Sequence, residues 1–376
     1  MAGDLTAQRV RALIDASGLS QAGFAAKAGL DASKMSKSLS GVRRFSSLDL
    51  AHIAELGGVS VDWLLGAKPA KPALAARASN THDGAVEAAV REATRFAQAR
   101  EDLAFLGYHQ PEGPTITAGR KVDGEELAAS AVEEVRTAGG DPLARDLSDV
   151  IETCFGVDLA VTAIPAGCDG LAWRDDHARL ILVATTEYPT RQRFTIVHEL
   201  GHLLAGDDQG LHVDEDVMDP ERRRQPSERR ANAFAAAFLL PEHELRAAVP
   251  DGSRLSLDTF AALVMRFSVS PSTLAYRLGN LRLITAGQRK EFRKLTTAAC
   301  ALRTGKAGEF AAWIEASRQP RLPGVLVRDS FSAYVDGKAT LRPFANLVGM
   351  DVEMLRRALE TPAGPGAAGD EPEFAP

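Results

Sequence analysis

The segment 194–204 constrains the chain most, because it contains the pattern His-Glu-x-x-His. In a helix, His198 and His202 are separated by about 400° of rotation, so both imidazoles lie on one face. Two nitrogens at this spacing can bind one tetrahedral Zn²⁺. Glu199 lies beside them, where its carboxylate can take a proton from a metal-bound water. The pattern therefore predicts a zinc site with two histidine ligands and Glu199 as the catalytic base.

Gly201 stands in the middle of this predicted helix. A glycine there costs about 1 kcal/mol relative to alanine, so we expect it to serve a purpose. Its apolar neighbours Val197 and Leu200 indicate a helix buried in the protein. We therefore expect another part of the chain to approach the helix closely at Gly201, beside the metal.

A third ligand is expected, because a catalytic zinc usually takes three protein ligands. Residues 227–241 read as a second helix, with Ser227 as its cap and Pro241 at its end. Glu228 and Asn232 are four residues apart and share one face of it. We interpret Glu228 as the third ligand and Asn232 as a residue that orients a ligand imidazole. The alternative is that Glu228 is a surface residue of an ordinary amphipathic helix.

His212 is the main rival to Glu228, since it follows His202 by ten residues. The metzincin pattern that it suggests needs a glycine and a histidine at fixed positions. Ala205 and Asp208 stand there instead, so we reject this arrangement. The surrounding stretch 206–219 is acidic but lacks the spacing of an EF-hand, which favours a solvated loop. His177 follows Asp175-Asp176 and is expected to be a turn residue.

Three blocks in this order, residues 193–202, 228–241 and 267–281, resemble the ImmA/IrrE family of bacterial metallopeptidases. The resemblance covers roughly residues 145–285. It implies a zincin-like fold, with zinc held by His198, His202 and Glu228 and with Glu199 as general base. It also implies regulated cleavage of a transcriptional repressor, often in stress or mobile-element circuits.

Residues 5–66 consist of short helical pieces separated by glycines. A helix, a tight turn around Gly29 and a second helix within about twenty residues is helix-turn-helix geometry. The stretch resembles the Xre/Cro-like repressor domain, which implies operator DNA as a partner. The residues expected to contact DNA are Ser33, Lys34, Ser36 and Lys37 at the major groove, and Gln21, Arg43 and Arg44 at phosphates. The alternative is a module that binds protein or has lost DNA binding.

The net charge of −6 argues against non-specific adhesion of the whole molecule to nucleic acid or anionic membrane. Residues 1–70 contain eight Lys/Arg and six Asp/Glu, a local charge of +2. This positive excess is small. We therefore expect DNA affinity to depend on a homodimer.

Three scattered cysteines fit a reducing compartment without a disulfide framework. The chain opens without a basic and apolar leader. It also lacks an apolar run near the ~20 residues that a membrane span requires. We predict a cytoplasmic protein that makes no use of a membrane.

The expected fold class is α+β. An all-α helix-turn-helix domain precedes a zincin-like domain, built from a small sheet and the active-site helices, and a mainly helical C-terminal region. Helix is expected over 143–155, 257–267, 290–302 and 308–317, and strands over 157–164, 170–174 and 179–184. The last strand is either central or at an edge. The expected divisions are a helix-turn-helix domain (1–68), a linker (69–82), a helical spacer (83–141), the zincin-like domain (142–285), a helical region (286–360) and a disordered tail (361–376).

These features together predict a DNA-binding zinc endopeptidase whose substrate is a repressor or a similar regulatory protein. Cleavage would use zinc-activated water with Glu199 as general base. The alternative is a transcription regulator whose zincin-like domain senses a metal or ligand and cleaves nothing. By chemistry alone, the candidates to stabilise the oxyanion are Tyr188, Tyr276 and Arg193. The stretch 340–359 resembles a degenerate helix-turn-helix and is better interpreted as a helical packing pair.

Overall fold

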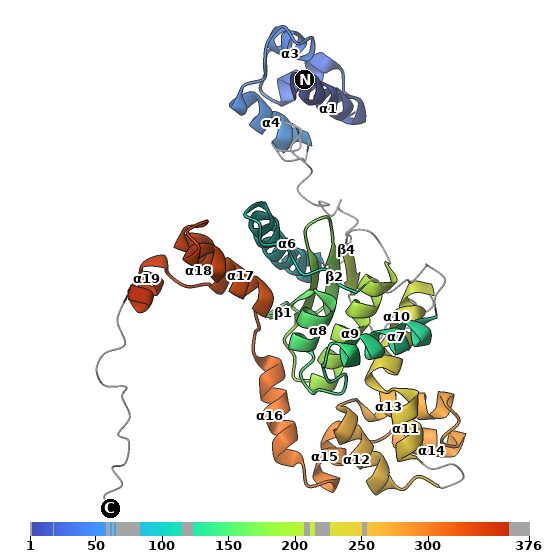
Figure 1. Cartoon of the computed structure of the whole chain (residues 1–376). Helices are drawn as coiled ribbons and strands as arrows, with labels where there is room; N and C mark the ends of the chain where they lie inside the picture. Colours follow the sequence, from blue (N-terminus) through green and yellow to red (C-terminus); the bar gives the residue numbers. More distant parts are fainter. Residues whose placement is uncertain are drawn as a thin grey trace, which may run out of the picture. The chain divides into compact units, whose positions relative to one another are not determined.

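The computed structural model forms two compact units, one ending at Ala78 and the other starting at Ser79 (Figure 1). The structure describes residues 2–17, 19–57, 61, 64, 83–114, 123–206, 211–214, 226–249 and 254–360. The predicted linker and the predicted disordered tail lie outside these residues.

The first unit is helical and has its own apolar core. Ser20 begins the second helix by accepting a hydrogen bond from the Gly23 amide, and Asp31 begins the third by accepting from Ser33 and Lys34. The core contains Phe24 and Met35 among other apolar residues. Its described residues include the helices α1 (Ala2–Ser17), α2 (Gln21–Lys27), α3 (Ala32–Leu39) and α4 (Ser47–Gly57).

The second unit contains a four-stranded sheet of order β1-β3-β2-β4. β1 is parallel to β3, whereas the two other pairings are antiparallel. β3 is therefore a central strand. Its sequence was compatible with either a central or an edge position. The strands are β1 (Asp158–Thr162), β2 (Gly170–Arg174), β3 (Arg179–Ala184) and β4 (Leu211–Asp214). β4 falls within the stretch expected to be a solvated acidic loop.

The two faces of the sheet are covered by different helices, because side chains alternate along a strand. Leu180 and Leu182 of β3 belong to the apolar cluster that contains α6 (Asp83–Phe105). Ile181 and Val183 belong to the cluster of α9 (Pro189–Ala205), the helix that carries the His-Glu-x-x-His pattern. A mostly helical chain with a small sheet confirms the α+β class.

Residues 143–147 are not helical, so the helix expected over 143–155 starts only at Ser148 (α8, Ser148–Phe155). Asp146 accepts a hydrogen bond from the Ser148 amide at 2.8 Å, a local bond that competes with helix. The carbonyls of Ala144 and Arg145 are bound by the Arg193 guanidinium instead of by helical amides.

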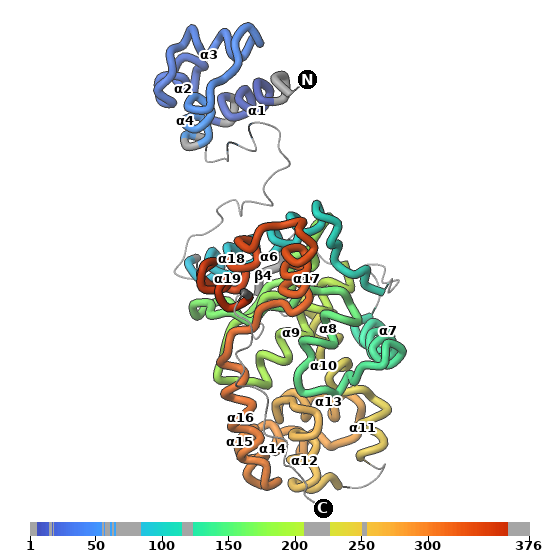
Figure 2. The backbone as a smooth tube through the Cα atoms, turned by 60° about the vertical axis from the view of Figure 1, so that its left-hand side comes forward, coloured from blue at the N-terminus to red at the C-terminus, as the bar shows by residue number. Residues whose placement is uncertain are grey.

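The predicted helix 290–302 is also wrong, because two helices divide it. Thr296 begins the second one by accepting from the Ala299 amide. Figures 1 and 2 show α16 running from the group formed by α12–α15 towards α17 beside the sheet. The helices of this region are α11 (Glu242–Ala248), α12 (Leu257–Phe267), α13 (Pro271–Asn280), α14 (Ala286–Phe292), α15 (Thr297–Arg303), α16 (Ala307–Arg318), α17 (Gly324–Val335), α18 (Leu341–Val348) and α19 (Val352–Glu360).

A buried ion-pair network attaches α17 to the sheet. The fully buried Arg100 guanidinium of α6 lies 2.6 Å from Asp158 of β1 and 2.7 Å from Asp329 of α17. Removal of one partner from a buried ion pair of this kind strongly destabilises the fold, because the other charge is left buried without compensation.

Among the helices of the described ranges, none combines the length and apolar character needed to cross a bilayer.

Candidate metal centre

The helix α9 places its two histidines in the interior of the second unit. Pro189 occupies its first turn, where a missing amide hydrogen costs nothing, and Gly206 ends it with φ +65°. Val197 and Leu200 pack into the core on either side of the histidines. His198 and His202 are both at most 1% exposed.

Glu228 reaches the two histidines from α10 (Pro226–Leu239). The Nε2 atoms of His198 and His202 are 3.1 Å apart. The Glu228 carboxylate oxygens lie 3.3 Å from the first Nε2 atom and 3.4 Å from the second. Bonds of about 2.0–2.1 Å around a tetrahedral zinc place neighbouring donors about 3.3 Å apart. The three donors therefore fit the edges of one zinc coordination tetrahedron.

Glu199 lies on the same helix turn and is fully buried. Its backbone position follows His198 directly, which places its carboxylate at the border of the metal face of α9. A buried carboxylate at a metal site is a candidate proton acceptor.

The position of Glu228 depends on two close helix contacts. A Cβ added to Gly201 would lie 2.8 Å from the Phe234 ring of α10. A Cβ added to Gly124, in α7 (Gly124–Thr137), would lie 2.3 Å from the carbonyl oxygen of Arg230. Glycine on both neighbours thus lets α10 approach closely. The part of the chain expected to approach Gly201 is Phe234.

The other residues predicted on α10 lie as follows. The helix begins at Pro226, so Ser227 is inside the first turn and does not precede it. Asn232 follows Glu228 by one turn and is half-buried. Among the described residues, its side chain forms no hydrogen bond to either imidazole, so its orienting role stays a prediction.

The three oxyanion candidates have different surroundings. Tyr188 precedes α9 and is 65% exposed. Tyr276 is stacked under Arg293, whose guanidinium carbon lies 4.5 Å from the ring centroid. Arg193 donates to the Ala144 and Arg145 carbonyls. Its Cα is five residues before His198, about 140° away around the helix, so we withdraw Arg193 as an oxyanion candidate.

Two further histidines were weighed in the sequence, His212 and His177. His212 lies in β4, opposite Ala172 of β2. Asp175 accepts hydrogen bonds from the amides of His177 and Ala178, which makes His177 a turn residue as predicted.

The residues predicted to contact DNA lie in the first unit. Ser33, Lys34, Ser36 and Lys37 are all exposed on α3, and Gln21 is exposed at the start of α2. Arg44 is exposed, but Arg43 forms an ion pair with Asp49 at 2.9 Å. The structure thus presents α3 for contact, whereas Arg43 already has a partner within the unit.

Residues 156–279 match the family model described as the IrrE N-terminal-like domain. Two relatives named radiation response metalloprotease IrrE, from Deinococcus radiodurans and Deinococcus deserti, are each 34% identical over 170 residues. The match covers 44% of this chain, and 47% and 55% of the relatives. The chain thus spans about half the length of the curated relatives that it matches. Residues 156–279 are thus similar to the IrrE N-terminal-like domain, which supports the resemblance to the ImmA/IrrE family.

Proposed function

We propose that the chain is a zinc-dependent endopeptidase with a DNA-binding N-terminal unit, and that it cleaves a repressor or a similar regulatory protein. The observation that carries the proposal is the convergence of three buried donors from α9 and α10 beside Glu199. Two imidazoles and one carboxylate are a donor set typical of zinc peptidases. The names of the two relatives support peptidase activity.

The four residues of the site would have two different roles, as metal ligands and as catalytic base. His198, His202 and Glu228 would hold the metal, because their donor atoms are 3.1–3.4 Å apart. A bound zinc ion would lower the pKa of a water molecule towards about 7 and polarise a peptide carbonyl. The Glu199 carboxylate would serve as the proton acceptor of the reaction and as the proton donor to the leaving amine.

The donors are closed off from solvent in this structure. His198 and Glu199 are fully buried, and Glu228 is 5% exposed. A peptide substrate therefore needs a movement of the surrounding chain before it can reach Glu199.

The direct test is the variant Glu199→Gln, compared with wild type by quantitative proteomics of the producing cells. The variant keeps all three metal donors, so its metal content should equal that of wild type. Loss of the catalytic base should slow cleavage by about 10²–10⁴-fold. We expect a repressor-like protein to accumulate in the variant. Equal abundance of all such proteins in the two strains would refute peptidase function.

DNA binding is proposed for the exposed face of α3. Replacing Lys34 and Lys37 by alanine should weaken binding to the protein's own promoter and relax its sequence preference, because both residues are expected to contact bases in the major groove. The matched control removes the same charge from exposed lysines of the second unit, Lys290→Ala with Lys294→Ala. Equal binding by both double variants would remove α3 as the recognition helix.

A second candidate is a transcription regulator that senses a ligand and cleaves nothing, which the closure of the metal centre favours. The same Glu199→Gln variant distinguishes the two. A pure sensor keeps its regulatory phenotype in that variant, because the metal donors and the DNA-binding face are intact.

A further inference from the structure

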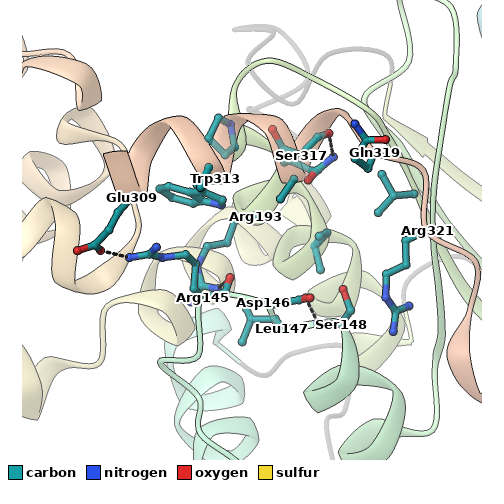
Figure 3. A pocket seen from close by; sticks show the side chains of 16 residues that line it. Arg145, Asp146, Leu147, Ser148, Arg193, Glu309, Trp313, Ser317, Gln319 and Arg321 are labelled. Carbon is teal, nitrogen blue, oxygen red and sulfur yellow. Dashed lines mark hydrogen bonds and ion pairs between the residues drawn. The ribbon is translucent and has the colours of Figure 1, made fainter. Parts of the chain in front are cut away.

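A cavity of about 440 Å³ lies on the side of α9 away from the metal donors. Figure 3 shows its walls, which come from the turns at 145–148, the first two turns of α9 and the helix α16. On α9 it is lined by Pro189, Gln192, Arg193 and Ile196. Pro189 and His198 are nine residues apart, about two and a half turns, which places them on opposite sides of the helix.

Arg193 is the unusual residue of this cavity. Its side chain is 4% exposed. One terminal nitrogen, Nη1, donates to the carbonyls of Ala144 at 2.5 Å and Arg145 at 2.6 Å. These two bonds fix the guanidinium. Nε and Nη2 are buried and have no hydrogen-bond partner among the described residues.

The two unpartnered atoms form one edge of the guanidinium. The Nε and Nη2 hydrogens of arginine point the same way and match the two oxygens of a carboxylate or phosphate group. A buried donor left without a partner costs about 1–3 kcal/mol, more for a charged group. Such a group is therefore expected to have a ligand.

The neighbouring charges do not fill this edge. Arg145 pairs with Glu309 at 3.0 Å, and Arg321 pairs with Glu152 at 2.9 Å. Asp146 lies close enough to favour the charged form of Arg193, but its Oδ1 accepts from the Ser148 amide. Burial is the larger influence and lowers the pKa of Arg193 to about 10, so the guanidinium is still charged at neutral pH.

The rest of the lining is mainly apolar and includes one large aromatic side chain. Trp313 of α16 faces the cavity, with the Arg145 guanidinium carbon 5.8 Å from its ring centroid (Figure 3). Val161, Leu147 and Ile196 also line it. Walls of this kind bind an apolar or aromatic body, while a few polar groups orient it.

We infer that this cavity binds a small organic anion, whose carboxylate or phosphate group lies on the Nε–Nη2 edge of Arg193 and whose apolar body lies against Trp313. The site is separate from the metal centre, because the two use opposite sides of α9. Residues 309–321, which form one wall, lie outside the stretch 156–279 that matches the family model. The site is thus built partly from the chain's own C-terminal region.

The test measures binding of benzoate and phenyl phosphate to the full chain by isothermal titration calorimetry, with benzamide as the neutral analogue of benzoate. At least one anion should bind with a Kd below about 1 mM, and benzamide at least about tenfold more weakly. The anion that binds identifies the group as carboxylate or phosphate. Binding of benzamide as tight as that of the better-bound anion, or no saturable binding of either anion, would overturn the inference.

Variants then locate the site. Arg193→Lys keeps a positive charge but cannot form two parallel hydrogen bonds, so binding should fall at least about tenfold. Arg191→Lys is the matched control, because Arg191 is exposed and paired with Asp169 at 3.0 Å. Trp313→Leu, on a half-buried residue of another helix, should also weaken binding and does not depend on how Arg193→Lys folds. Unchanged affinity in both Arg193→Lys and Trp313→Leu would place any bound anion elsewhere.

Discussion

The two sides of α9 bury charged or ionisable groups in opposite ways. On one side, His198 and His202 converge with Glu228, and the donor atoms are 3.1–3.4 Å apart. On the other side, Arg193 is anchored by one nitrogen, while the edge formed by its two other nitrogens meets no partner among the described residues.

This difference shows how burial indicates the kind of ligand. Buried polar groups normally have partners, so each exception needs an explanation. Several atoms of the kind that ligate metals, converging on one point, indicate a cation between them. A buried cation whose donating edge faces a cavity indicates an anion. One helix can therefore carry two ligand sites of opposite charge on its two sides.

Removal of metal should have the largest effect on stability. It should affect the metal side of α9 and leave the Arg193 side unchanged. A ligand present at about 1,000 times its Kd stabilises the folded state by about 4 kcal/mol. Dialysis against a chelator, followed by urea unfolding, should lower the free energy of unfolding by about that amount, and added zinc should restore it. Binding at Arg193 of whichever of the two test anions is taken up, benzoate or phenyl phosphate, should persist after dialysis. An unchanged unfolding curve would mean that no metal is bound at these donors.

The contact between Gly201 and Phe234 gives the next effect. Gly201→Ala forces α9 and α10 apart, since the new Cβ would lie 2.8 Å from the Phe234 ring. Overpacking of this kind costs about 1–3 kcal/mol. The variant should also bind zinc more weakly, because Glu228 moves with α10.

The matched control is Gly287→Ala in α14, where the nearest atom to the new Cβ is 3.8 Å away. This variant should be neutral or slightly more stable, because alanine favours helix. Both variants are compared by urea unfolding and by zinc titration. Full zinc affinity in Gly201→Ala would show that α10 positions Glu228 without this contact.

The smallest effect is expected at the wall of the cavity. The Ser317 hydroxyl of α16 donates to the Thr186 carbonyl at 2.8 Å, which connects α16 to the segment before α9. Ser317→Ala should lower stability by about 1 kcal/mol. It should weaken benzoate binding and leave zinc content unchanged. The control is Ser130→Ala, which removes a hydroxyl that is hydrogen-bonded within α7. Equal benzoate affinity in the two variants would show that Ser317 does not contribute to the site.

The sequence was most informative where a local pattern determines structure. The bounds of β2 and β3 follow from short, mainly apolar runs between turns, and those of α12 from its capped apolar repeat. Glu228 could be chosen as a third donor because its helix has a clear apolar stripe. Gly201 indicated a close approach, although only the packing identified Phe234 as the partner.

The predictions failed where contacts between segments far apart in the sequence determine the local structure. The expected helix at 143–147 is lost to hydrogen bonds that Arg193 makes across the unit. The sequence shows that Arg193 is charged, which makes it a candidate to stabilise the oxyanion. The sequence does not show which side of α9 packs against the metal donors. The cavity depends on α16, which is more than 100 residues away in the sequence, and no local pattern indicates it.

The most direct test of the metal centre is elemental analysis of purified wild type and Glu228→Ala after mild dialysis. Glu242→Ala is the control, because Glu242 is an exposed carboxylate paired with Arg246 on the surface. We predict about one zinc per chain in wild type and the control, and loss of zinc in Glu228→Ala. Zinc retained in Glu228→Ala, or absent from wild type, would contradict a site held by His198, His202 and Glu228.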